Sequence, residues 1–109
     1  MPESDIARIY KREFASAHII AEHPKCGRLH GHNYTLLVRV YGRSGEWLDF
    51  EEIKREVDGL VDGEYDHQDL GDMTCERLAR QIQERLINRF RNHVKIELWE
   101  TGKFGVETL

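Results

Sequence analysis

The feature that most constrains the fold is a strict alternation of side chains in residues 30–41. Side chains of a β-strand point alternately to its two faces, so residues two apart share a face. One face would carry two histidines followed by aromatic and aliphatic side chains: His30, His32, Tyr34, Leu36, Val38 and Val40. We therefore predict a β-strand over this segment, with both histidines on the same face.

Three further segments have strand character. Residues 6–20 place one set of side chains on a common side at period two: Tyr10, Phe14, Ser16 and His18. Residues 94–100 alternate again, and the turn-forming residues 101–103 lead into a last strand over residues 104–109. The sequence thus predicts one pair of strands at each end of the chain.

Two amphipathic segments separate these strand pairs. Asp49 is expected to cap the first helix, with Glu52 three residues later as in a capping box, and Gly63 to end it. Thr74 is expected to cap a second helix that extends to Phe90. Apolar residues recur at helical spacing in both segments, so each helix has one face to bury.

The predicted order of elements is strand, strand, helix, helix, strand, strand (ββααββ). Short turns between neighbouring strands favour antiparallel pairing, and two helices can cover one face of the sheet. We therefore predict a single α+β domain over residues 1–109, with a four-stranded antiparallel sheet and both helices on one face. Because so small a sheet leaves exposed edges, we expect oligomerisation to cover them.

The composition of the chain excludes several classes of protein. No segment approaches the roughly 20 apolar residues of a membrane helix, and charged residues make up 33% of the chain. The N-terminus lacks the positive flank and apolar run of a signal peptide, so a cytoplasmic location is expected. Two cysteines cannot form a disulfide framework. No patch of aromatic and basic residues appears outside the candidate site, so we expect no nucleic-acid partner.

The charge of the chain is unevenly distributed along the sequence. The net charge is −4, which by itself disfavours a polyanionic ligand. Residues 1–45, however, contain seven basic and four acidic residues, while residues 46–109 contain nine and sixteen. This distribution is compatible with a polyanion near the N-terminal half.

The histidine pair indicates a metal site. On an extended segment His30 and His32 point the same way, so both can offer an imidazole nitrogen to one ion. His18 can supply a third nitrogen if its strand pairs with theirs. Three histidines with an open fourth position are typical of catalytic zinc, whereas structural sites are closed by four protein ligands. The alternative is an ordinary group of surface histidines.

Cys26 is a candidate catalytic residue, because it lies in a glycine-containing loop beside Lys25 and Arg28. Nearby positive charge and a metal ion both favour the thiolate, which is the reactive form. Two other roles fit the same position: a small buried residue, or a fourth metal ligand that would close the site. Cys75 begins an apolar helix and is expected to be structural.

Two carboxylates complete the set of candidates. Asp66 precedes His67, and a carboxylate beside a histidine can orient the ring and favour its proton-donating form. The alternative there is a solvated acidic loop. Glu100 falls on the same alternate positions as the apolar side chains of residues 94–100, so it would lie on the apolar face of that strand. A carboxylate there either meets a ligand with N–H donors or reaches water.

Together these residues resemble the 6-pyruvoyl-tetrahydropterin synthase family, and most closely its 6-carboxy-tetrahydropterin synthase branch. The matching motifs are Phe14–His18, Cys26–Tyr34, Leu48–Phe50, Asp66–His67, Thr74 with Glu76, Leu78–Ala79 and Glu100–Thr101. They occur in the order of the family and span nearly the whole chain. The resemblance implies the tunnelling fold (T-fold), in which subunits form a ring with active sites between them and two trimers stack as a homohexamer.

The resemblance also implies a role for each candidate residue. It implies a zinc site with three ligands: His18, His30 and His32. Cys26 would be the general base, and Asp66 with His67 would relay a proton from the other side of the substrate. Glu100 would act in the same site by anchoring the pterin ring.

The remaining residues of the resemblance concern substrate binding. Thr74 and Glu76 would lie near the pterin pocket, although Thr74 equally fits a simple helix cap. Lys25 and Arg28 would neutralise a triphosphate. Three more basic residues are candidates for the same role: Lys11, Arg12 and Lys103.

By the same resemblance, the substrate would be 7,8-dihydroneopterin triphosphate and the product 6-carboxy-5,6,7,8-tetrahydropterin, with release of acetaldehyde and triphosphate. Such an enzyme is a zinc-dependent lyase on the route to 7-deazapurines such as queuosine. One alternative is a lyase that forms 6-pyruvoyl-tetrahydropterin or cleaves dihydroneopterin as an aldolase does. Another is a non-catalytic pterin- or zinc-binding subunit of the same fold.

Overall fold

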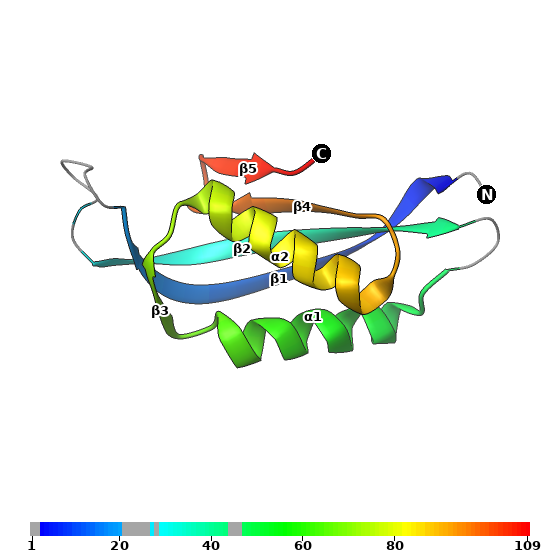
Figure 1. Ribbon diagram of the computed structural model, residues 1–109, viewed down its shortest axis with the longest axis horizontal. Coiled ribbons are helices and arrows are strands. Elements are labelled where there is room, and N and C mark those ends of the chain that lie inside the picture. Colours follow the sequence, from blue (N-terminus) through cyan, green and yellow to red (C-terminus); the bar gives the residue numbers. More distant parts are fainter. Residues whose placement is uncertain (1–2, 21–26, 28, 44–46) are drawn as a thin grey trace.

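The computed structural model describes residues 3–20, 27, 29–43 and 47–109, and it forms one sheet with two helices on one face (Figure 1). The elements in chain order are β1 (Glu3–Ile19), β2 (His30–Arg43), α1 (Phe50–Glu64), β3 (Gln68–Asp72), α2 (Cys75–Phe90), β4 (Val94–Trp99) and β5 (Gly105–Glu107). The strands lie in the order β3-β1-β2-β4-β5. β3 is parallel to β1, and the other neighbouring pairs are antiparallel.

The α+β class with two helices is confirmed, but the predicted four-stranded antiparallel sheet is wrong. The sheet has five strands and is mixed, and the order of elements is ββαβαββ. The missed strand, β3, has the sequence Gln-Asp-Leu-Gly-Asp, which lacks any apolar alternation. It pairs with the free edge of β1 through backbone groups: at its ends the N–H groups of His67 and Met73 donate to the carbonyl oxygens of Ala15 and Ile19.

Both predicted helix starts are confirmed by their caps. Oδ1 of Asp49 accepts a hydrogen bond from the backbone N–H of Glu51 at 2.9 Å. Oγ1 of Thr74 accepts one from the backbone N–H of Arg77 at 3.2 Å. These side chains satisfy N–H groups that the first turn of a helix leaves without a partner.

The sequence predicted that Gly63 would end α1, but the C-cap residue is Tyr65. The helix continues through Gly63 to Glu64, and the N–H of Tyr65 donates to the carbonyl oxygen of Val61 at 2.9 Å. The Tyr65 side chain is buried, and its hydroxyl donates to Oε1 of Gln81 in α2 at 2.6 Å. The chain therefore leaves the helix just before Asp66, at a buried residue that is bonded to α2.

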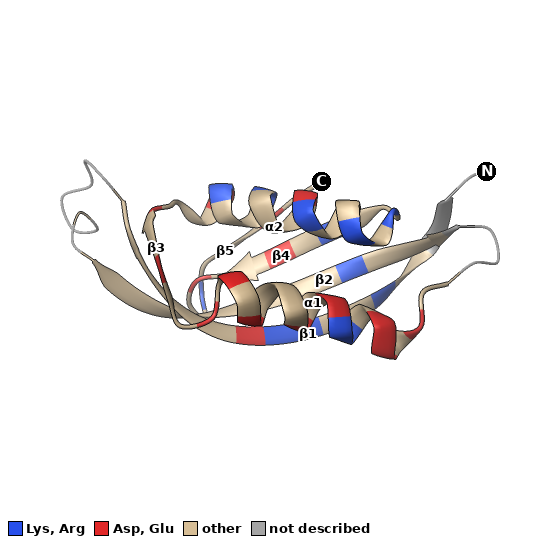
Figure 2. Cartoon of the chain, turned by 60° about the horizontal axis from the view of Figure 1, so that its bottom comes forward, with Lys and Arg blue, Asp and Glu red and all other residues tan. Residues whose placement is uncertain are grey.

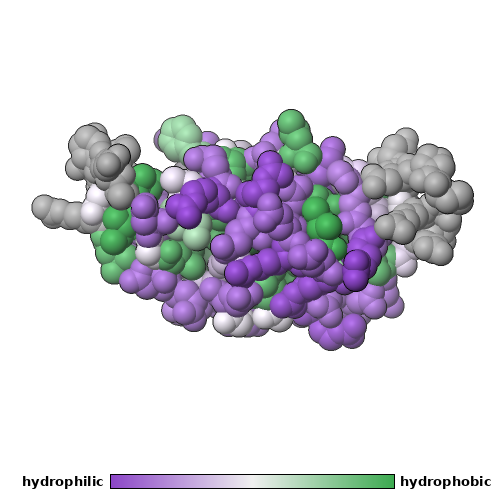
Figure 3. All heavy atoms as spheres, viewed as in Figure 1, coloured by the Kyte–Doolittle hydropathy of each residue, from purple (hydrophilic) through white to green (hydrophobic). Residues whose placement is uncertain are grey.

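The alternation of β2 determines the position of the core. Tyr34, Leu36 and Val38 are fully buried under the helices, whereas Thr35 and Leu37 between them are partly exposed on the other face. The helix side of the molecule is mostly hydrophilic on its outer surface (Figure 3). In the part of the chain that is described, neither helix is long and apolar enough to cross a membrane.

Candidate active site

Three histidines lie together at one end of the sheet. In the antiparallel register of β1 and β2, His18 is directly opposite His30, and His32 is opposite Ser16. The ring centroids are 4.4 Å apart for His18 and His30, 4.9 Å for His18 and His32, and 4.8 Å for His30 and His32. Strand pairing thus places all three imidazoles on the helix-covered face of the sheet.

Glu100 reaches this cluster from the end of β4. Its Oε1 lies 2.7 Å from Nε2 of His32 and 3.4 Å from Nε2 of His18. One possible ligand atom from each of the three histidines and from Glu100 lies within 4.8 Å of the others. These four side chains could hold one metal ion.

The hydrogen bonds of the histidines fit a metal ion. Nδ1 of the fully buried His18 lies 2.7 Å from the carbonyl oxygen of Met73, and a carbonyl only accepts, so this nitrogen carries the proton. The buried Nε2 atoms of His18 and His32 have no hydrogen-bond partner among the described residues. Burial, which is the largest effect, lowers the pKa of His32 and favours the neutral ring that metals bind. Imidazole nitrogens and a carboxylate oxygen are donors that zinc accepts.

Met73 was not a candidate from the sequence. It contributes only its backbone carbonyl, which every residue has, so no pattern of side chains could reveal the contact with His18. Histidines that bind metals commonly donate their second N–H in this way, which fixes the tautomer and the orientation of the ring.

Asp66 and His67 form a second polar group beside β1. Oδ1 of Asp66 accepts a hydrogen bond from the backbone N–H of Ala15 at 3.0 Å and lies 3.1 Å from Nδ1 of His67. The hydrogen bond from Ala15 is the largest cause of the lowered pKa of Asp66. His67 has a φ of 58°, a left-handed conformation that is uncommon for a residue other than glycine. Its side chain is 82% exposed, so the strained backbone presents an oriented imidazole to the solvent.

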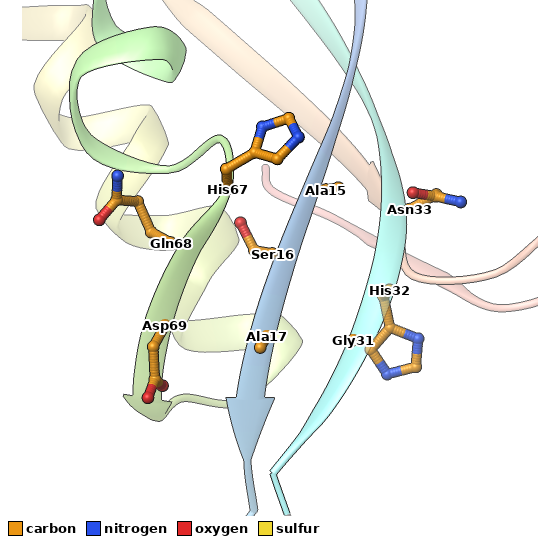
Figure 4. A pocket seen from close by; sticks show the side chains of 9 residues that line it. All are labelled: Ala15, Ser16, Ala17, Gly31, His32, Asn33, His67, Gln68 and Asp69. Carbon is orange, nitrogen blue, oxygen red and sulfur yellow. The ribbon is translucent and has the colours of Figure 1, made fainter.

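An open pocket of about 470 Å³ is lined by one residue from each polar group, His32 and His67. His32 and His67 line it at two sides, and β1 passes between them with the small side chains of Ala15 and Ala17 (Figure 4). Its volume lies within the range of roughly 300–1,000 Å³ that is usual for small-molecule sites. The structure thus combines a candidate metal centre, an oriented histidine and a cavity of ligand size.

The family model described as 6-pyruvoyl tetrahydropterin synthase matches residues 8–108 of the chain. The chain belongs to this family. The resemblance identified from the sequence motifs is therefore confirmed.

Two archaeal relatives in the 6-pyruvoyl tetrahydropterin synthase family are both named "Putative 6-carboxy-5,6,7,8-tetrahydropterin synthase". The protein from Methanocaldococcus jannaschii is 36% identical over 78 residues, which are 68% of this chain and 47% of that protein. The protein from Archaeoglobus fulgidus is 33% identical over 86 residues, which are 69% of this chain and 74% of that protein. The chain thus spans about half the length of the first relative.

Solved structures show the same fold. The 6-pyruvoyl tetrahydropterin synthase of Caenorhabditis elegans matches with a TM-score of 0.81 and 25% identity, covering 99% of this chain and 96% of that one. An uncharacterized protein from Wolinella succinogenes matches with a TM-score of 0.80 and 16% identity, covering 94% and 96%. The second likeness shows the fold alone.

The remaining candidate residues lie outside the histidine cluster or outside the described part of the chain. Thr74 caps α2, and Glu76 is exposed in the first turn of that helix. Three candidates lie outside the described residues: Cys26, Lys25 and Arg28. The second cysteine, Cys75, is buried with its Sγ 3.8 Å from the carbonyl oxygen of Leu98, and burial raises the pKa of its thiol to about 12. This thiol is therefore protonated near neutral pH.

Arg12, a candidate for triphosphate binding, forms ion pairs with three carboxylates. Its guanidinium nitrogens lie 3.0 Å from Oδ1 of Asp58, 2.5 Å from Oδ1 of Asp62 and 3.6 Å from Oδ2 of Asp66. Figure 2 shows the basic residues of β1 beside the acidic residues of α1. Arg12 therefore ties β1 to α1 and to Asp66, and its charge is already balanced.

Replacing Arg12 by methionine is expected to lower the free energy of unfolding by about 1–3 kcal/mol at pH 7, because carboxylates lose their cation. Burial alone would raise the pKa of Asp58, but the hydrogen bonds that it accepts lower it below its usual value of 3.8. This stabilisation is present above that value and is lost as the pH falls through the lowered pKa. The difference between the variant and the wild type should therefore shrink below about pH 4.

Urea denaturation at pH 7 and pH 3 measures this effect of Arg12. Replacing the exposed Lys11 on the same strand by methionine is the matched control, and it should change the free energy of unfolding by less than about 0.5 kcal/mol. An Arg12 effect of the same size at both pH values would contradict the electrostatic explanation.

Proposed function

We propose that this chain is a zinc-dependent 6-carboxy-5,6,7,8-tetrahydropterin synthase. Its substrate would be 7,8-dihydroneopterin triphosphate, and with the uptake of one water molecule it would form the 6-carboxy product and release acetaldehyde and triphosphate. The observation that most supports the proposal is the cluster of three histidines and a carboxylate, in which two buried Nε2 atoms have no hydrogen-bond partner among the described residues. The two archaeal relatives are named for this activity.

The metal would be held by three residues: His18, His30 and His32. When bound, zinc would supply Lewis-acid polarisation of the hydroxyl groups of the substrate side chain. The neighbouring carbon proton would then be more acidic, so the protein needs a base to remove it and an acid to return one. We assign the acid to His67, whose Nδ1 lies 3.1 Å from Oδ1 of Asp66.

Asp66 holds His67 in position, and His67 donates a proton on one face of the substrate. Cys26 removes a proton on the opposite face as a thiolate. Lys25 and Arg28 neutralise the triphosphate, which leaves as a polyanion. We do not assign Arg12 to this binding, because its guanidinium already pairs with Asp58, Asp62 and Asp66.

We also propose that the protein works as a homo-oligomer, with a trimer-based hexamer as the expected state. The two edges of the sheet are β3 and β5, with five and three residues. Ile9 on β1 is a large apolar side chain that is 51% exposed, and a second copy of the chain could cover it. Paired edges would continue the sheet from one copy to the next, and they would place the cavity between subunits.

The proposed activity is tested by incubating the zinc-loaded protein with 7,8-dihydroneopterin triphosphate and identifying the products by mass. A 6-carboxy product with acetaldehyde is expected, and removal of the metal by a chelator should abolish it. A 6-pyruvoyl product or aldol cleavage would replace this proposal by the related lyase activities. Binding of the substrate without any conversion would indicate a non-catalytic member of the fold.

A further inference from the structure

We propose that Glu100 is the fourth ligand of the metal ion when no substrate is bound, and that the substrate displaces it. This inference rests on the metal site proposed above. It differs from the open fourth position that a three-histidine pattern predicts. The family resemblance implies that Glu100 anchors the pterin ring. The role proposed here belongs to the protein before the substrate binds.

The carboxylate of Glu100 is at the spacing of a metal ligand. Its Oε1 lies 2.7 Å from Nε2 of His32 and 3.4 Å from Nε2 of His18. In a tetrahedral zinc site with bonds of about 2.0–2.1 Å, neighbouring ligand atoms are roughly 3.3 Å apart. Together with His30, the four ligand atoms lie within 4.8 Å of one another, which is compact enough for one ion.

The Glu100 carboxylate approaches both Nε2 atoms without a hydrogen bond of normal geometry, and these contacts are ion pairs only when the ring is protonated. The Nε2 atoms of His18 and His32 have no hydrogen-bond partner among the described residues, although the carboxylate oxygen is close to both. The proton of His18 is on Nδ1, which donates to Met73, so Nε2 presents a lone pair to the oxygen. Two electron-rich atoms repel each other at this distance, and a cation between them removes the repulsion.

The Glu100 side chain can leave the cluster without disturbing the sheet. It directly follows Trp99, the last residue of β4, and its backbone N–H donates to the carbonyl oxygen of Phe104 at 2.9 Å. The side chain is 23% exposed, so one side of it faces open space. Rotation about side-chain bonds would therefore move the carboxylate while the backbone stays in place.

Coordination by Glu100 would close the metal site of the substrate-free protein. With Glu100 as a ligand, protein atoms would occupy all four positions, as in a structural zinc site, and no position would remain for water. A substrate with adjacent hydroxyl groups would take the place of the carboxylate. The released Glu100 could then accept two adjacent N–H donors of the ring.

Cobalt substitution tests this inference, because the visible absorption of Co²⁺ reports its ligands independently of turnover. Replacing Glu100 by glutamine is expected to change the spectrum of the substrate-free protein. It should also weaken Zn²⁺ binding at least about ten-fold in competition with a chromogenic chelator. Adding 7,8-dihydroneopterin to the wild-type protein should change its spectrum as the carboxylate leaves.

The control is Glu84→Gln, at an exposed glutamate of α2, which should keep the wild-type spectrum and affinity. Wild-type behaviour of Glu100→Gln would overturn the inference. His30→Ala in the same assay distinguishes failure of the fourth-ligand role of Glu100 from failure of the metal site itself. If His30→Ala loses the metal while Glu100→Gln does not, only the fourth-ligand role fails; if both retain it, the proposed metal site fails as well.

Discussion

Under the proposed function, replacing His30 by alanine is expected to abolish metal binding and to lower turnover at least about 1,000-fold. His30 is the cross-strand neighbour of His18 and supplies one of the three nitrogens of the cluster. Lewis-acid polarisation is worth several kcal/mol in a transition state, and each 1.4 kcal/mol is about a factor of ten in rate. Metal content per chain, from elemental analysis of the purified protein, and product formation measure the two effects.

The matched control for His30 is His93→Ala. His93 lies at the other end of the sheet, where its ring centroid is 5.3 Å from that of Tyr41. This variant should keep the metal and the wild-type turnover. If His30→Ala protein still carried one metal ion per chain, the histidine cluster would not be the metal site.

Replacing His67 by asparagine is expected to lower turnover by about 10²- to 10⁴-fold, the usual contribution of a general acid or base. The free energy of unfolding should change by less than about 0.5 kcal/mol, because the side chain is 82% exposed. Asparagine also tolerates the left-handed backbone that His67 adopts at a φ of 58°. A large loss of activity without a loss of stability is the signature of a functional residue.

Turnover under saturating substrate and urea denaturation of the same preparation separate these two effects of His67. Arg91→Asn is the matched control, since Arg91 is also left-handed, with a φ of 60°, and lies at the C-cap of α2. It should leave turnover unchanged. Full activity of the His67→Asn protein would show that the exposed imidazole takes no part in the reaction.

The metal-site candidates could be predicted from the sequence because strand parity is a local property. Residues two apart in a strand share a face, so His30 and His32 had to point the same way once residues 30–41 formed β2. The helix starts were predictable for a similar reason, since Asp49 and Thr74 satisfy N–H groups within three residues of themselves.

Other features could not be predicted, because they depend on contacts between distant segments. β3 has no apolar pattern of its own and is a strand only because the free edge of β1 is available to it. Arg12 could bind either phosphate or carboxylate by its sequence, and the proximity of α1 decided for carboxylate.

Local periodicity therefore determined which side chains of this chain share a face, where both helices begin, and that three histidines could meet on paired strands. Only the tertiary structure decided that the carboxylate of Glu100 lies among those histidines and that His67 is held outward beside β1. Parity and capping act over a few residues, so a single segment encodes them. The positions of Glu100 and His67 depend on which strands pair and on how the turns return the chain to them, and no single segment encodes that.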